Sequence, residues 1–130
     1  MKVLALDYGS ARTGVAVSDP TGTLARPLGV VERAATDDGL AELARLAREE
    51  EVERIVVGLP LTMRGSRGEQ AVETERFVES LRAAVDVPIE LYDERFTTDL
   101  AQQTAGSAPE DALAAAHLLS TYLEWCAARS

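Results

Sequence analysis

The stretch "VLALDYGSARTGVAVSD", residues 3–19, decides the fold that this sequence predicts. It contains two apolar runs, residues 3–8 and 13–18, and each run has the length and composition of a buried β-strand. Gly9 lies between the two runs and Gly14 lies near the start of the second, and glycines at these positions permit a tight turn. The stretch therefore predicts two consecutive strands joined by a short hairpin.

Asp7 ends the first apolar run with a carboxylate. Because side chains alternate between the two faces of a strand, Asp7 shares its face with Val3 and Ala5, two small apolar residues. The carboxyl ends of strands in α/β sheets are the places where ligands collect. Asp7 is therefore a candidate site residue, although acids also end strands in ordinary turns.

The rest of the sequence alternates between strand and helix patterns. A third strand is predicted over residues 24–31, where Pro27 favours an edge position. Helical spacing of apolar residues, short apolar runs and a capping signal then predict, in chain order, a helix at 38–51, a strand at 55–57, a helix at 68–84, a strand at 87–92 and a helix from Ser107. This order predicts one α/β domain over residues 1–130, with a five-stranded mixed sheet whose first three strands form an antiparallel meander, flanked by helices.

Composition limits the classes of function. No apolar run approaches the roughly 20 residues that span a bilayer and no signal peptide is recognisable, so we expect a cytoplasmic protein without a membrane partner. The single cysteine, Cys126, cannot form an internal disulfide. A formal net charge of -9 opposes binding to polyanions. Every basic residue except Lys2 is an arginine, the side chain better suited to forked contacts with phosphate.

Two further acids can face Asp7. Asp93 and Glu94 end the strand predicted at 87–92, and alternation places them on opposite faces without choosing between them. Asp111 lies in the first turn of the last helix, on the stripe that must pack against the sheet. A carboxylate on a buried stripe is costly unless it is paired or bound to a cation.

Acids from three separate elements at one sheet edge suggest a site for Mg²⁺ or Mn²⁺. Two such ions activate water and stabilise the leaving oxygen in phosphodiester hydrolysis. Simpler interpretations remain for the last two positions. The "DER" turn at 93–95 could be an exposed salt-bridged turn, and an acid such as Asp111 is favoured in the first turn of any helix.

Four blocks in order, "LDYGSARTGVAVSD", "VVGLPLTMRGSRGEQAVETERFVESL", "LYDERFTT" and "EDALAAAHLLSTYL", resemble the YqgF/RuvX family nearly end to end. Members are described as RNase H-like Holliday junction resolvases or as nucleases of the pre-16S rRNA. The resemblance implies an RNase H-like fold and a metal-dependent nuclease that processes the precursor of small-subunit rRNA, resolves Holliday junctions, or does both. It implies that Asp7, Glu94 and Asp111 are the catalytic acids and hold Mg²⁺ or Mn²⁺.

Nucleic acid is the partner that this resemblance implies, as structured RNA or a four-way DNA junction. Four arginines fall in loops at or near the expected active edge and could bind phosphate despite the acidic whole, although exposed arginines are commonly only solvated: Arg12, Arg64, Arg67 and Arg95. A homodimer would match the twofold symmetry of a junction, but no residue indicates one.

Two other classes of protein remain open. Residues 96–110, "FTTDLAQQTAGSAPE", contain no Lys or Arg where family members commonly carry a longer basic segment. That departure favours a non-catalytic adaptor that keeps the fold. Asp7-x-Gly9 with Gly14 also resembles the first phosphate loop of actin-like and sugar-kinase ATPases, but those enzymes close two lobes over a nucleotide and 130 residues supply only one. Metal dependence separates a nuclease from an adaptor.

Overall fold

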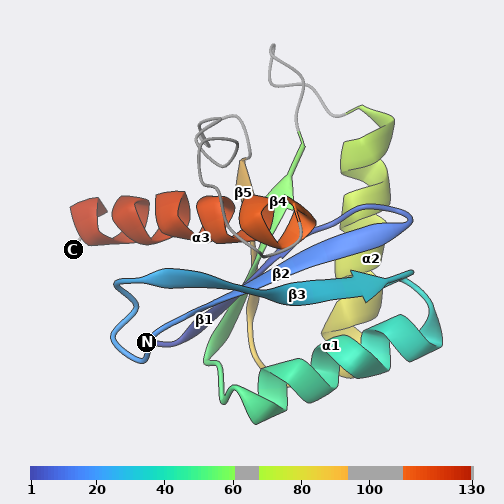
Figure 1. Cartoon of the computed structure of the whole chain (residues 1–130). Helices are drawn as coiled ribbons and strands as arrows, with labels where there is room; N and C mark the ends of the chain where they lie inside the picture. The colour runs from blue at the N-terminus through green and yellow to red at the C-terminus, as the bar shows by residue number, and fades with distance from the viewer. Residues whose placement is uncertain (61–67, 94–109, 130) are drawn as a thin grey trace.

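In the computed structural model of the chain, residues 1–60, 68–93 and 110–129 are described. Figure 1 shows a twisted sheet with helices on both sides. Its elements, in chain order, are β1 (Val3–Asp7), β2 (Arg12–Ser18), β3 (Ala25–Glu32), α1 (Asp37–Glu49), β4 (Arg54–Leu59), α2 (Glu69–Ala84), β5 (Ile89–Asp93) and α3 (Glu110–Arg129). The predicted order of strands and helices is confirmed.

The five strands form one mixed sheet in the order β3-β2-β1-β4-β5. β1 pairs antiparallel with β2, and β2 pairs antiparallel with β3, so the first three strands are the predicted meander. β4 pairs parallel with β1 and with β5. β3 lies at one edge of the sheet, as predicted. An edge strand tolerates Pro27 because it pairs with a neighbour on one side only.

The sheet separates two apolar layers, as alternation in β1 predicts. Leu4 and Leu6 face α1 and α2 and pack with Leu43 and Phe77. Among the described elements, α3 packs against the opposite face, through a cluster that includes Val3, Ala5, Ala16, Val56, Ala115, Leu118 and Tyr122. In Figure 1, α3 lies on one side of the sheet, and α1 and α2 lie on the other. Asp7 therefore shares its face with the side chains that contact α3.

Helix ends follow local chemistry. The hydroxyl of Thr36 accepts a hydrogen bond from the backbone N–H of Gly39 at 3.2 Å and caps α1. α1 ends at Glu49, two residues before the predicted end, and Glu51 has a positive φ of 54° that no helix continues through.

The predicted cap Ser107 lies outside the described residues. Within the described ranges, no helix has the length and apolarity that a membrane crossing needs.

Candidate active site

The carboxyl ends of the three parallel strands meet at one edge of the sheet. Leu6 of β1 lies beside Val57 of β4, and Val57 lies beside Leu91 of β5. Asp7 is the last residue of β1 and is half-buried at this edge. We call this end of the sheet the active edge. In α/β sheets, ligands bind beyond the carboxyl ends of the strands.

Gly14 brings the start of α3 to Asp7. In β2 it lies directly opposite Asp7 in the antiparallel pair. A Cβ atom on Gly14 would overlap the backbone carbonyl of Asp111 and would lie 3.2 Å from the backbone nitrogen of Ala112. The first turn of α3 therefore rests on bare backbone beside Asp7. The structure thus places two of the three predicted acids, Asp7 and Asp111, at the same edge.

This position of Gly14 corrects one expectation from the sequence. Gly14 was expected to help form the hairpin turn, but it lies inside β2 and serves as the contact surface for α3. Gly9 does have the expected role, because a Cβ atom there would lie 2.5 Å from the carbonyl oxygen of Arg12. A glycine inside a strand is itself a sign that another backbone approaches closely, and this was the signal in the sequence.

Arg12 forms an ion pair with Asp111. Its Nε lies 3.3 Å from Oδ2 of Asp111, and the two side chains are 65% and 38% exposed. The backbone of Arg12 is held more firmly than its side chain. The buried hydroxyl of Thr13 accepts a hydrogen bond from the N–H of Gly9 at 3.4 Å, and Arg12 pairs with Glu32 of β3. The sequence predicted Arg12 in a loop near this edge, whereas the structure makes it the first residue of β2 and gives it a partner, Asp111, that was not predicted.

The third predicted acid, Glu94, lies outside the described residues. The strand before it is informative, because Tyr92 packs on the α3 face and Leu91 on the opposite face. Asp93, which alternates with Tyr92, is therefore directed away from the face of Asp7. Within residues 1–60, 68–93 and 110–129, no group of three or more His, Cys, Asp or Glu side chains is arranged to hold a metal ion. Arg64, Arg67 and Arg95 also lie outside the described residues.

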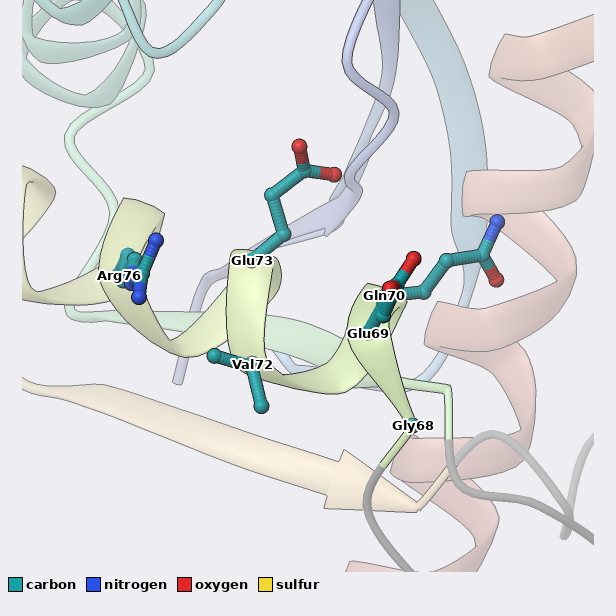
Figure 2. A pocket seen from close by; sticks show the side chains of 6 residues that line it. All are labelled: Gly68, Glu69, Gln70, Val72, Glu73 and Arg76. Atoms are coloured by element: carbon teal, nitrogen blue, oxygen red, sulfur yellow. The ribbon is translucent and has the colours of Figure 1, made fainter.

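The first turns of α2 line a pocket of about 570 Å³ and give it an acidic character (Figure 2). Among the described residues that line it, the charged ones are Glu69, Glu73 and Arg76. The Glu73 side chain points toward the β1–β2 hairpin in Figure 2. Tyr8, directly after Asp7, stacks on Phe77 of α2 with ring centroids 4.4 Å apart. Burial, and then the negative charge of Glu73, raise the pKa of the Tyr8 hydroxyl.

A second polar cluster lies on the α3 face near the opposite edge of the sheet, and sequence reasoning missed it. Arg54 donates to the Tyr122 hydroxyl at 2.8 Å, and that hydroxyl donates to Oε1 of Glu90 at 2.8 Å. Burial raises the pKa of Tyr122, and its hydrogen bond to Arg54 opposes that shift. Three partners hold each other here, so we interpret the cluster as structural.

Comparison with solved structures identifies the class of fold. Thermus thermophilus RuvC in complex with a Holliday junction substrate superposes with a TM-score of 0.64 at 19% identity, covering 97% of this chain and 96% of RuvC. The Fowlpox virus resolvase bound to Holliday junction DNA gives a TM-score of 0.57 at 12% identity, covering 97% and 99%. At these identities the likeness concerns the fold, and the fold is the predicted RNase H-like one.

The sequence gives the family. The profile described as "RuvX: Holliday junction resolvase" matches residues 1–125. A protein of Chloroflexus aurantiacus named "Putative pre-16S rRNA nuclease" is 41% identical over 131 residues, which cover 94% of this chain and 86% of the relative. A protein of Syntrophomonas wolfei with the same name is 35% identical over 133 residues, covering 95% and 94%. The chain belongs to the RuvX family, and it is a hydrolase of the nuclease class.

Proposed function

We propose that this chain is a divalent-metal-dependent endonuclease that cuts structured nucleic acid at the active edge, with Asp7, Glu94 and Asp111 as its metal ligands. The expected substrates are the pre-16S rRNA precursor, named in the relatives, and the four-way DNA junction, named in the family description. The observation that carries the proposal is the contact of α3 with Gly14, because it brings Asp111 beside Asp7.

The donor set fits a hard cation. Asp7 and Asp111 supply carboxylate oxygens, which suit Mg²⁺ and Mn²⁺. Asp111 already has a positive charge beside it, the guanidinium of Arg12 at 3.3 Å. The direction of Asp93 away from the face of Asp7 favours Glu94 over Asp93 as the third ligand. When bound, the cations would supply an activated water and stabilisation of the leaving oxygen.

The residues of this chain would then position the substrate. Arg12 at the rim can bind a phosphate of the backbone through the forked donors of its guanidinium. We propose the same task for Arg64, Arg67 and Arg95, which the sequence places in loops near this edge.

The test is cleavage by Asp7→Asn. The substitution keeps the shape of the side chain and removes the charge that a cation requires, so we expect cleavage to fall by about 100-fold or more while the free energy of unfolding changes little. End-labelled structured RNA and a four-way DNA junction are incubated with Mn²⁺, Mg²⁺ or chelator, and products are resolved on gels. The preferred substrate decides between RNA processing and junction resolution.

Asp86→Asn is the matched control, because Asp86 is exposed and precedes β5 at the far edge of the sheet. It should cleave like the wild type. Undiminished cleavage by Asp7→Asn would overturn the assignment of Asp7. Folded wild-type protein that cuts neither substrate in either metal would favour the adaptor, which keeps the fold and does not cut.

A homodimer would place two active edges on the two equivalent strands of a junction. Light scattering of the protein with and without junction DNA measures this. A mass of one chain per junction would count against the dimer without affecting the proposed metal ligands.

A further inference from the structure

The ion pair between Arg12 and Asp111 has a second consequence for the proposed function. Asp111 is a proposed metal ligand, yet its Oδ2 lies 3.3 Å from Nε of Arg12. A cation bound by this carboxylate would bring its positive charge next to that of the guanidinium. Two positive charges beside one carboxylate repel each other, so a cation on Asp111 weakens the ion pair with Arg12. The guanidinium of Arg12 therefore competes with a cation for the carboxylate of Asp111.

The ion pair between Arg12 and Asp111 is weak enough to be displaced. Both side chains are substantially exposed, and Nε of Arg12 lies 3.3 Å from Oδ2 of Asp111. Exposed pairs of this kind hold weakly because water screens the charges and ordering two side chains costs entropy. A divalent cation gains more from the carboxylates, since it attracts each of them with twice the charge.

The backbone of Arg12 stays in place when its side chain is released. Three features hold the Arg12 backbone at the start of β2. They are the tight turn at Gly9, the hydrogen bond between Gly9 and Thr13, and the pairing of Arg12 with Glu32. The freed guanidinium therefore moves about a fixed Cα atom at the active edge. It remains within a side chain's length of any phosphate bound there.

We propose that Arg12 is a phosphate-binding residue that Asp111 retains until a divalent cation replaces it. Binding of the cation then frees the arginine for the nucleic-acid backbone, and a bound phosphate removes the arginine from the path of the cation. The two ligands strengthen each other by the same factor, as linkage requires. This coupling rests on the proposed function, since it takes Asp111 to be a metal ligand.

The first measurement is calorimetric titration of the protein with Mn²⁺ in the absence of nucleic acid. Arg12→Gln removes the competing charge, so we expect it to bind Mn²⁺ about 2- to 5-fold more tightly than the wild type, the factor that an exposed ion pair represents. Arg12→Lys keeps the charge and should stay near the wild type. Arg26→Gln is the matched control, because Arg26 is 60% exposed and pairs with Glu50 at 3.4 Å elsewhere on the surface.

The second measurement is fluorescence anisotropy of a labelled four-way DNA junction with and without Ca²⁺, a cation that carboxylates bind, with gels to confirm that the probe stays intact. The wild type and Arg26→Gln should gain affinity when Ca²⁺ is added. Arg12→Gln should gain several-fold less, because it has no guanidinium to release. Low, constant salt keeps the comparison sensitive to a single phosphate contact.

The outcomes separate this coupling from the proposed function. If the wild type binds Mn²⁺, Asp7→Asn loses that binding, and Arg12→Gln binds as the wild type does, the coupling is wrong and the metal site stands. If Arg12→Gln binds Mn²⁺ more weakly, Arg12 supports Asp111 as a ligand instead of competing for it, and the coupling is again wrong. If the wild type binds no Mn²⁺, both the metal site and the coupling fail.

Discussion

Two arginine–carboxylate pairs lie on the α3 face of the sheet, toward opposite edges, and they differ in how firmly they are held. Arg12 and Asp111 lie 3.3 Å apart, between Nε and Oδ2, and are 65% and 38% exposed. Arg54 and Glu90 are 32% and 36% exposed, and the Tyr122 hydroxyl bonds to both. The same two chemical groups therefore form a loose pair at the active edge and a fixed network near the other edge. The difference separates residues that can exchange partners from residues that hold α3 to the sheet.

Gly14→Ala should have the largest effect, because it disturbs the seat of α3 beside the loose pair. The new methyl group would overlap the backbone carbonyl of Asp111, and backbone cannot move aside as a flexible side chain can. We expect the free energy of unfolding to fall by about 3 kcal/mol or more. Urea denaturation measures this.

The control for Gly14→Ala is Gly29→Ala in the edge strand β3, where a Cβ atom would meet nothing within 4 Å. This variant should be close to the wild type. Equal stability of the two variants would mean that α3 does not rest on Gly14.

Tyr122→Phe should have the next largest effect, because it removes the hydroxyl at the centre of the fixed network. Tyr122 is almost fully buried, and both of its partners would lose a hydrogen bond to it. We expect a loss of about 1–3 kcal/mol in the free energy of unfolding. Cleavage under conditions where the variant is folded should be unchanged, since this network lies away from the active edge.

The same residue predicts a pH dependence. The pKa of Tyr122 is raised above its usual value of 10.0, chiefly by burial. The neutral phenol is therefore favoured in the folded chain, so its contribution to stability is complete below pH 10 and is lost as the pH rises further. Urea denaturation of the wild type should show this decline above pH 10. Tyr122→Phe should decline less, and parallel curves for the two proteins would contradict the assignment.

Arg12→Gln should have the smallest effect on stability. The pair that it breaks is exposed, so we expect a change within about 0.5 kcal/mol in the free energy of unfolding. Urea denaturation beside Tyr122→Phe makes the comparison direct. A loss as large as that of Tyr122→Phe would show that the two arginine pairs are equally structural.

The fold could be predicted because its signals are local. The two apolar runs at residues 3–8 and 13–18 predicted the first two strands, and Pro27 predicted the edge strand. The position of Asp7 followed from the alternation of side chains along the first run. Alternation between the two faces of a strand therefore predicted the place of one site residue, Asp7, at the end of β1.

The contacts between distant elements could not be predicted in this way. The pairing of Arg12 with Asp111 depends on how α3 crosses the sheet, and the glycine inside β2 signals that a backbone approaches closely without saying which element supplies it. The Arg54, Tyr122 and Glu90 network has the same origin, since its members come from three elements. Glu94 stays a prediction that rests on the family and on the alternation in β5.

The packing of α3 on Gly14 also determines when the proposed metal site can form during synthesis. Asp7 emerges from the ribosome in the first strand, whereas Asp111 emerges in the last helix, after all five strands of the sheet. Contacts between residues so far apart in the chain form late, because the intervening chain must first be ordered. A nascent chain that ends before residue 111 lacks one proposed ligand however well its sheet has folded. Synthesis itself therefore delays the assembly of the proposed metal site until the last helix can dock.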